Sequence, residues 1–253
     1  MIRWAIHRVD DSFEELKKLP DGCVDVVLTD PPYSEHVQSN MSSGTAMKRQ
    51  VEGGKGGGIP RIELPFEALS GYEFAIDLVR MAKRWAISFC AFEDFGLYRA
   101  AVGSDAWVRS GCWLKPNAMG QLTGDRPATA YEGLAIMHRA GKKQWNGRGS
   151  YGYWICNGTR GEKDRHPNQK PLNLCLELVA KFTNRGETVL DPFAGSGRIG
   201  EACLMLGRNY VGMERDEEWV EKSRARLANV SVESVKDEDC MRLCALPKRE
   251  KVK

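Results

Sequence analysis

A glycine-rich loop in the last quarter of the chain has residue types suited to binding a cofactor. Residues 191–200 read DPFAGSGRIG and contain three glycines in the spacing G-x-G-x-x-G, between an apolar stretch and a helical pattern. Glycines at this spacing allow a tight turn and a close approach of the backbone to a ligand. Glu214, at the end of the next expected strand, could accept hydrogen bonds from ribose hydroxyls. The loop therefore predicts a nucleoside-bearing cofactor.

Asp191 indicates which cofactor this is. A dinucleotide site normally lies near the start of its domain, with no charge ahead of the glycines, whereas Asp191 directly precedes this loop. A carboxylate there would repel a pyrophosphate, but it suits the cationic amino-acid end of S-adenosylmethionine. We therefore expect S-adenosylmethionine. A dinucleotide such as NAD and a purely structural glycine turn are the alternatives.

A second unusual string, Asp30-Pro31-Pro32-Tyr33, follows an apolar stretch near the start of the chain. From average residue usage, such a string should arise by chance in a chain of this length on the order of once in a thousand. Taken alone, it could be a proline-rich turn with a capping aspartate.

Alternating strands and helices are expected to position these two loops. Apolar runs predict strands over 2–7, 24–29, 85–90, 188–191 and 210–214, and helical spacing predicts helices over 12–19, 72–84, 172–183, 198–206 and 216–229. Two further strands, 112–114 and 133–137, have no long helix between them and suggest an antiparallel pair at a sheet edge. The pattern predicts an α/β fold with a doubly wound, mostly parallel sheet and ligands at the carboxyl ends of its strands.

The overall composition is that of a globular chain. Its 253 residues are 42% hydrophobic and 28% charged, with a net charge of +3 and no apolar run of the length that a membrane helix needs. We expect one large domain or one domain with a small insert, no membrane partner and, because residues 1–8 do not resemble a signal peptide, a cytoplasmic location. The eight cysteines include no CxxC pair, so we expect reduced thiols and no metal site.

The weak net charge hides a strongly basic segment. Residues 139–170 contain eight basic and two acidic side chains, a local charge of +6, interleaved with Trp145, Tyr151, Tyr153 and Trp154. This composition predicts a small recognition insert over 139–165 that contacts double-stranded DNA. The predicted DNA-binding residues are Lys142, Lys143, Arg148, Arg160 and Arg165. A basic surface without a specific partner is the alternative.

Four segments in a fixed order resemble a known family. Asp30-Pro31-Pro32-Tyr33 is followed by HPNQKP at 166–171 and by the loop at 191–200, and 10–14 is similar to a G-D-x-x-E element with Asp10 in place of glycine. On these segments the chain resembles the amino-group DNA methyltransferases of the beta arrangement. The resemblance implies a Rossmann-like methyltransferase fold with a circularly permuted motif order.

The resemblance assigns catalysis to Asp30, Pro31, Pro32 and Tyr33. An aromatic exocyclic amine is a poor nucleophile, because its lone pair is delocalised into the ring. The Asp30 carboxylate and the Pro31 carbonyl can each accept one amine hydrogen and turn the lone pair toward the methyl donor. Pro32 stiffens the turn, and Tyr33 offers a ring for stacking on a flipped base.

The resemblance also implies a cofactor site. Its predicted members are Asp11, Asp30, Lys170, Asp191, Pro192, Phe193, Gly195, Ser196, Gly197, Glu214 and Arg215. For Asp11 a helix N-cap is an equal alternative, and for Lys170 a solvated or phosphate-contacting role. Trp113 either supports the flipped base or belongs to the core.

The function expected from these residues is S-adenosylmethionine-dependent methylation of adenine N6 in a specific double-stranded DNA sequence, by base flipping. Cytosine N4 is the main alternative; an NAD-dependent oxidoreductase and a catalytically silent DNA-binding regulator are more distant ones. We expect a catalytic domain over 1–138 and 166–232, a flexible active-site loop over 34–65 and a solvated tail over 233–253. A monomer and a homodimer are both open, and no nuclease is expected in the same chain.

Overall fold

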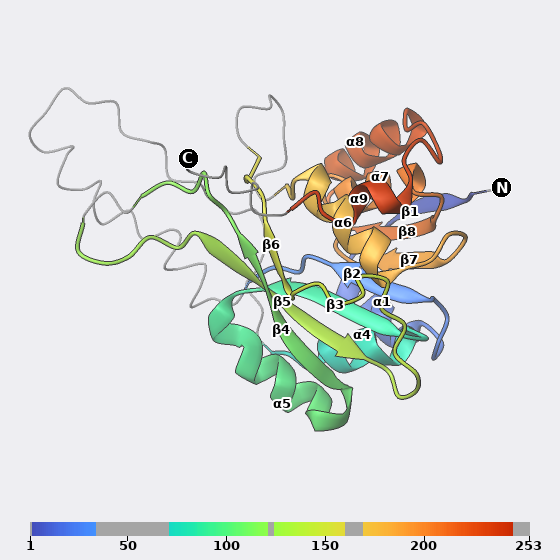
Figure 1. The fold of residues 1–253 in the computed structure, drawn as a ribbon. Coiled ribbons are helices and arrows are strands. Elements are labelled where there is room, and N and C mark those ends of the chain that lie inside the picture. The colour runs from blue at the N-terminus through green and yellow to red at the C-terminus, as the bar shows by residue number, and fades with distance from the viewer. Residues whose placement is uncertain (1, 34–70, 121–123, 160–168, 245–253) are drawn as a thin grey trace, which may run out of the picture.

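The computed structural model of the chain describes residues 2–33, 71–120, 124–159 and 169–244. Its centre is a sheet of eight strands in the order β1-β8-β7-β2-β3-β5-β4-β6 (Figure 1). The strand bounds are β1 Trp4–Arg8, β2 Val26–Thr29, β3 Trp85–Cys90, β4 Trp107–Leu114, β5 Tyr131–His138, β6 Tyr153–Ile155, β7 Thr188–Asp191 and β8 Asn209–Glu214. Only β5 among these strands pairs antiparallel with its neighbours. The predicted mostly parallel α/β sheet is confirmed.

Helices cover both faces of this sheet. They are α1 Ser12–Lys18, α4 Phe74–Met81, α5 Phe95–Ala106, α6 Leu172–Phe182, α7 Arg198–Met205, α8 Glu217–Ala228 and α9 Asp237–Cys240, with a short 3-10 turn at Phe92–Asp94. One core cluster joins the sheet to α6, α7, α8 and α9, and a second joins it to α1, α4 and α5 (Figure 1). Strands β2 and β3 are buried along their whole length, because both their faces are covered.

Helix α5 and strand β6 were not predicted from the sequence. Helix α5 has no clear apolar stripe: Tyr98 is its one buried residue, and Gly103 interrupts it with a φ of 76°. Strand β6 has only three residues, too few to form a pattern. It pairs with β4, so the antiparallel β4–β5 pair is confirmed but lies one strand inside the edge.

The predicted solvated tail is wrong for the residues between 237 and 244. Helix α9 packs on α6, and Cys240 and Cys244 are buried in the core. The Cys244 amide donates to Glu177 Oε2 at 2.6 Å. The many charges around α9 hid the two cysteines that anchor it, because a four-residue helix shows no periodicity. Residues 245–253 lie outside the described residues.

All eight cysteines carry free thiols, five of them buried. Among the described residues, no helix has the length and apolar composition to cross a membrane.

Candidate active site

The two unusual loops of the sequence lie next to each other at one edge of the sheet. Strand β2 leads into Asp30, β7 ends at Asp191, and these neighbouring strands are parallel. Thr29 Oγ1 donates to Asp191 Oδ1 at 2.7 Å, which joins segments 162 positions apart. Carboxyl ends of parallel strands form the usual ligand-binding edge of such a sheet.

The glycine loop has the backbone geometry that its sequence predicts. Gly195 and Gly197 have φ values of 47° and 71°, in the left-handed region that favours glycine. The Gly195 amide donates to Glu214 Oε2 at 2.8 Å, and Glu214 Oε1 accepts from the amides of Arg215 and Asp216 at 2.9 Å each. A carboxylate has about four acceptor positions, so Glu214 can accept one more hydrogen bond, as the predicted contact with a ribose hydroxyl requires. The loop and Glu214 therefore fit a nucleoside cofactor.

Asp191 is the last residue of β7 and lies buried directly before this loop. Its carboxylate accepts from Thr29 Oγ1, from the Phe193 amide at 3.2 Å and from the Tyr210 hydroxyl at 3.2 Å. Burial raises the pKa of Asp191 to about 7, and these three hydrogen bonds only partly oppose the effect. Contact with the cationic end of the cofactor remains a prediction, since the described partners of Asp191 are all neutral.

Asp191→Asn should become more stable relative to wild type as the pH rises. The pKa of Asp191 is higher in the folded chain, at about 7, than its ordinary value of 3.8. Its stabilising contribution is therefore complete below pH 4 and is lost as the pH rises through 7. Urea unfolding should show that the free energy of unfolding of the variant, relative to that of wild type, rises by roughly a few kcal/mol between pH 5 and pH 8. Asp105→Asn, at an exposed position of α5, is the control. A stability difference between Asp191→Asn and wild type that is equal at both pH values would contradict the prediction.

Asp30 belongs to a buried cluster of charges. Lys170 Nζ lies 2.6 Å from Asp30 Oδ2 and 3.0 Å from Glu132 Oε2. Glu132 also pairs with Lys115, and it accepts a hydrogen bond of 2.8 Å from the Tyr33 hydroxyl. Asp30 Oδ1 is buried and has no hydrogen-bond donor among the residues that the structure describes. One Asp30 oxygen is therefore held by an ammonium group, while the other is available as an acceptor.

Burial and charge set the protonation of this cluster. Burial raises the pKa of Asp30 to about 6, with Lys170 opposing the rise and Glu132 adding to it. Burial would also raise the pKa of Glu132, but Lys170 and Lys115 lower it to about 2. The two carboxylates outweigh burial at Lys170 and raise its pKa above the ordinary value. Near neutral pH, both carboxylates and Lys170 are charged.

Comparison with known proteins identifies the family. A model of N6/N4 methyltransferases, described as DNA methylase, matches residues 95–225, just over half of the chain. The chain belongs to this DNA methylase family. An NAD-dependent oxidoreductase is thereby set aside. The matched region runs from α5 to α8, and the string at Asp30 lies outside it.

Individual relatives of this DNA methylase support the same conclusion. Type II methyltransferase M.HinfI of Haemophilus influenzae is 24% identical over 252 residues, which cover 87% of this chain and 67% of that protein. Type II methyltransferase M2.MboI of Moraxella bovis is 40% identical over 67 residues, 26% of this chain and 24% of the relative.

Solved structures share its fold. The M1.HpyAVI–SAM complex has a TM-score of 0.64 at 21% identity, covering 88% of this chain and 98% of that one. The PvuII DNA methyltransferase, described as cytosine-N4-specific, has a TM-score of 0.64 at 12% identity, covering 95% and 91%. The methylase therefore has the methyltransferase fold that its motif order implied.

Several predicted cofactor residues have other neighbours in the methylase. Lys170 contacts Asp30 and Glu132, as described above. Asp11 caps α1 and accepts from the amides of Phe13 at 2.8 Å and Glu14 at 3.4 Å, which is the alternative considered for it. The Arg215 side chain is exposed, whereas Pro192 and Ser196 are buried in the loop.

Other contacts around the site were not predicted. Ser12 Oγ donates to the Pro192 carbonyl at 2.6 Å and ties α1 to the glycine loop. Trp113 is buried, and its indole donates to the Cys156 carbonyl at 2.9 Å, so it belongs to the core. Glu132 and Lys115 lie outside the four segments that resemble family motifs, at 10–14, 30–33, 166–171 and 191–200. The one available signal for Glu132 was a charged residue at the start of the apolar run YEGLAIMH.

Three of the predicted DNA-binding residues lie at the amino-terminal ends of the parallel strands, opposite the ends that carry Asp30 and the glycine loop. Gly133 pairs with Cys90 at the end of β3, whereas His138 pairs with Trp85 at its start. The loop after β5 therefore begins far from Asp30, and its Lys142, Lys143 and Arg148 are exposed there. Their role in DNA binding remains a prediction.

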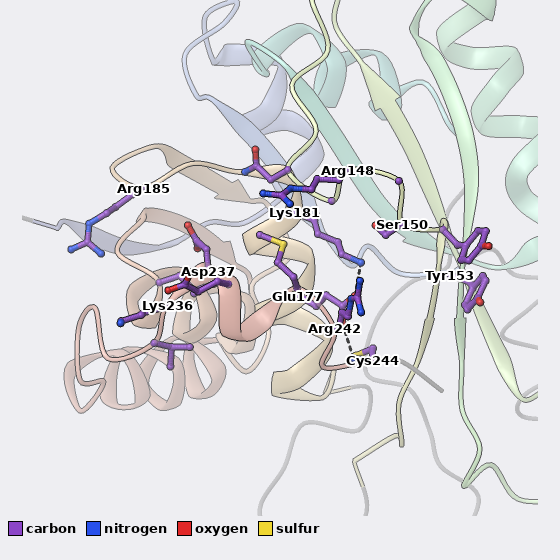
Figure 2. Close-up of a pocket in the computed structure, with 18 of the residues that line it drawn as sticks. Arg148, Ser150, Tyr153, Glu177, Lys181, Arg185, Lys236, Asp237, Arg242 and Cys244 are labelled. Atoms are coloured by element: carbon purple, nitrogen blue, oxygen red, sulfur yellow. Dashed lines mark hydrogen bonds and ion pairs between the residues drawn. The ribbon is translucent and has the colours of Figure 1, made fainter. Parts of the chain in front are cut away.

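Arg148 borders a separate hollow with a volume of about 1190 Å³, shown in Figure 2. It lies between the 146–151 loop, α6 and α9, and its lining mixes basic residues such as Lys181 and Arg242 with Glu177 and Asp237. No residue of 30–33 or 191–200 lines it. This hollow is therefore distinct from the candidate active site.

The remaining two predicted DNA contacts, Arg160 and Arg165, lie outside the described residues, as does the predicted loop at 34–65. Thr159 and Gln169, the described residues that flank 160–168, are in contact. Thr159 Oγ1 donates to the Gln169 carbonyl at 2.8 Å. Gln169 directly precedes Lys170, so Thr159 lies close to the segment that carries Lys170.

Proposed function

We propose that this DNA methylase transfers a methyl group from S-adenosylmethionine to the exocyclic N6 of adenine in a specific double-stranded DNA sequence. The observation that carries the proposal is Asp30 Oδ1, a buried acceptor with no donor among the described residues, at the end of β2. Support for the cofactor comes from the glycine loop, from Glu214 and from the relative solved in complex with SAM.

The chemistry begins with the target amine. Asp30 Oδ1 accepts one amine hydrogen and the Pro31 carbonyl accepts the other, so the nitrogen lone pair leaves the plane of the base. Lys170 holds the other Asp30 oxygen and keeps the carboxylate oriented. Tyr33 presents its ring to a base flipped out of the duplex.

S-adenosylmethionine, when bound, supplies the electrophilic methyl group. The glycine loop and Glu214 would hold its nucleoside part next to Asp30, because β7 and β2 are neighbours. The amine nitrogen gives up one proton as it gains the methyl group. Asp30 is already hydrogen-bonded to that nitrogen, and its pKa of about 6 suits it to take the proton near neutral pH.

The choice of adenine over cytosine rests on the first residue of the catalytic string, which is aspartate rather than serine. Cytosine N4 is the second candidate, because a cytosine-N4-specific methyltransferase shares the fold. Residues 139–165 remain the proposed recognition segment within one catalytic domain.

Tritium transfer from labelled S-adenosylmethionine to unmodified double-stranded DNA tests this function. Mass spectrometry of the nucleosides should then find N6-methyladenine, and single-molecule sequencing should find it within one recurring sequence. N4-methylcytosine would replace the adenine assignment with the cytosine alternative. Absence of transfer to DNA of any sequence would reject the proposal.

A further inference from the structure

Glu132 joins residues that come from three separate parts of the chain. It lies near the start of β5, next to the carboxyl end of β3, and its side chain is only 17% exposed. Its carboxylate accepts from Lys170 at 3.0 Å, from the Tyr33 hydroxyl at 2.8 Å and from Lys115. One residue outside the family motifs thus contacts both the catalytic string and the lysine that pairs with Asp30.

Lys115 completes the cluster from the end of β4. Its amide donates to the Ala130 carbonyl at 2.8 Å, which ties the segment after β4 to the one before β5. Its ammonium group pairs with Glu132 and lies 4.6 Å from the centre of the Trp113 ring. The Lys115 ammonium group is therefore held in place by contacts with residues of β4 and β5.

The four charges of this cluster balance one another. Two carboxylates, Asp30 and Glu132, face two ammonium groups, Lys170 and Lys115. Removal of one partner from a buried ion pair leaves an uncompensated charge, which is strongly unfavourable. Each charge therefore constrains the position of the other three.

This arrangement acts on both groups that would meet the target base. Lys170 orients Asp30, and Lys170 itself is held between Asp30 and Glu132. The Tyr33 ring is oriented by the hydrogen bond that its hydroxyl donates to Glu132. A shift of Glu132 would move the amine acceptor and the stacking ring together.

We propose that Glu132 is a positioning residue for methyl transfer and that Lys115 holds it in place, so that this pair controls the orientation and charge of Asp30. The inference rests on the proposed function and extends it to two residues outside the four motif segments at 10–14, 30–33, 166–171 and 191–200. Neither residue needs to contact the reacting atoms. They act through Lys170 and Tyr33.

The charges around Asp30 predict opposite effects for the two residues. The titratable groups that influence Asp30, or are influenced by it, are Lys170, Glu132, Lys115, Tyr33, Cys90 and Asp191. Glu132 raises the pKa of Asp30 and Lys115 lowers it. Loss of the Glu132 charge should shift the acid side of the activity profile to lower pH, and loss of the Lys115 charge should shift it to higher pH.

The test measures kcat and KM against pH for Glu132→Gln, Glu132→Asp and Lys115→Gln. Glu132→Gln should lower kcat about 100-fold, the loss expected from a small misplacement of reacting groups, with the KM for S-adenosylmethionine changed less than about threefold. Glu132→Asp keeps the charge and should recover part of the rate. Lys115→Gln should also lower kcat, with the opposite pH shift.

A matched control is the buried pair of Glu177 and Lys181, whose Oε1 and Nζ atoms lie 2.5 Å apart. Glu177→Gln removes a buried charge of the same kind away from Asp30, so it should lower Tm without moving the pH profile. Wild-type kcat and pH profile in Glu132→Gln, or shifts of equal sign in the Glu132 and Lys115 variants, would overturn the inference. If Glu132→Gln does not fold, Lys115→Gln decides by the direction of its shift. An inactive wild-type enzyme would instead reject the proposed function.

Discussion

Asp30→Asn should lower kcat for methyl transfer by about 100- to 1,000-fold, the loss typical of removing one preorganised hydrogen-bonding group from a reacting centre. Asparagine can still accept a hydrogen bond, but it carries no charge to attract the amine hydrogen or to take the proton from the nitrogen. Its amide group would also face Lys170 Nζ, which now lies 2.6 Å from Asp30 Oδ2. The substitution therefore affects both carboxylate oxygens.

Two measurements separate this chemical loss from a loss of fold. S-adenosylhomocysteine should raise the Tm of Asp30→Asn nearly as much as that of wild type, because the glycine loop and Glu214 are unchanged. Asp105→Asn, at an exposed position of α5, should keep full activity. A kcat within threefold of wild type in Asp30→Asn would show that the amine acceptor lies elsewhere.

Gly200→Ala should destabilise the chain by about 2 kcal/mol, a typical cost of forcing extra volume into a packed core. A Cβ at Gly200 would lie 2.6 Å from Cε1 and 2.8 Å from Cδ1 of Tyr210, and both atoms belong to a fully buried ring. Because the Tyr210 hydroxyl donates to Asp191, a displaced ring would also disturb Asp191, a residue of the predicted cofactor site. We expect Tm to fall by roughly 4 to 8 °C and cofactor affinity to fall with it.

Gly96→Ala provides the matched control within the same chain. Gly96 also lies in the first turn of a helix, and a Cβ there would meet no atom within 4 Å. Its Tm should stay the same or rise slightly, since alanine favours a helix more than glycine does. Equal effects of the two substitutions would show that contact with Tyr210 is not the cause.

Much of the site was predictable because its parts are local. The spacing of Gly195, Gly197 and Gly200 after an apolar run defines a strand, a turn and a helix without any distant residue. Asp30 likewise follows its strand directly. The predicted parallel sheet placed ligands at the carboxyl ends of its strands. That β2 and β7 are neighbours, so that the two loops meet through the Thr29–Asp191 hydrogen bond, is shown only by the structure.

The position of the predicted DNA-binding residues relative to Asp30 could not be predicted from local sequence. A basic composition indicates a polyanion partner, but it carries no information on which edge of the sheet the residues occupy. The antiparallel direction of β5 places Lys142 and Lys143 at the edge opposite Asp30. The buried Cys240 and Cys244 show the same limit, because their partners on α6 are distant in the sequence.

The fold class, the family resemblance and the two loops that carry the proposed chemistry could be predicted from residue types and short-range spacing. The charges that surround Asp30 could not, because they come from segments distant in the sequence. Glu132 and Lys115 reach it because β5 pairs antiparallel between β3 and β4, and this brings the start of β5 and the end of β4 beside the end of β3. Such contacts depend on strand pairing between distant segments, which no local pattern of residues specifies.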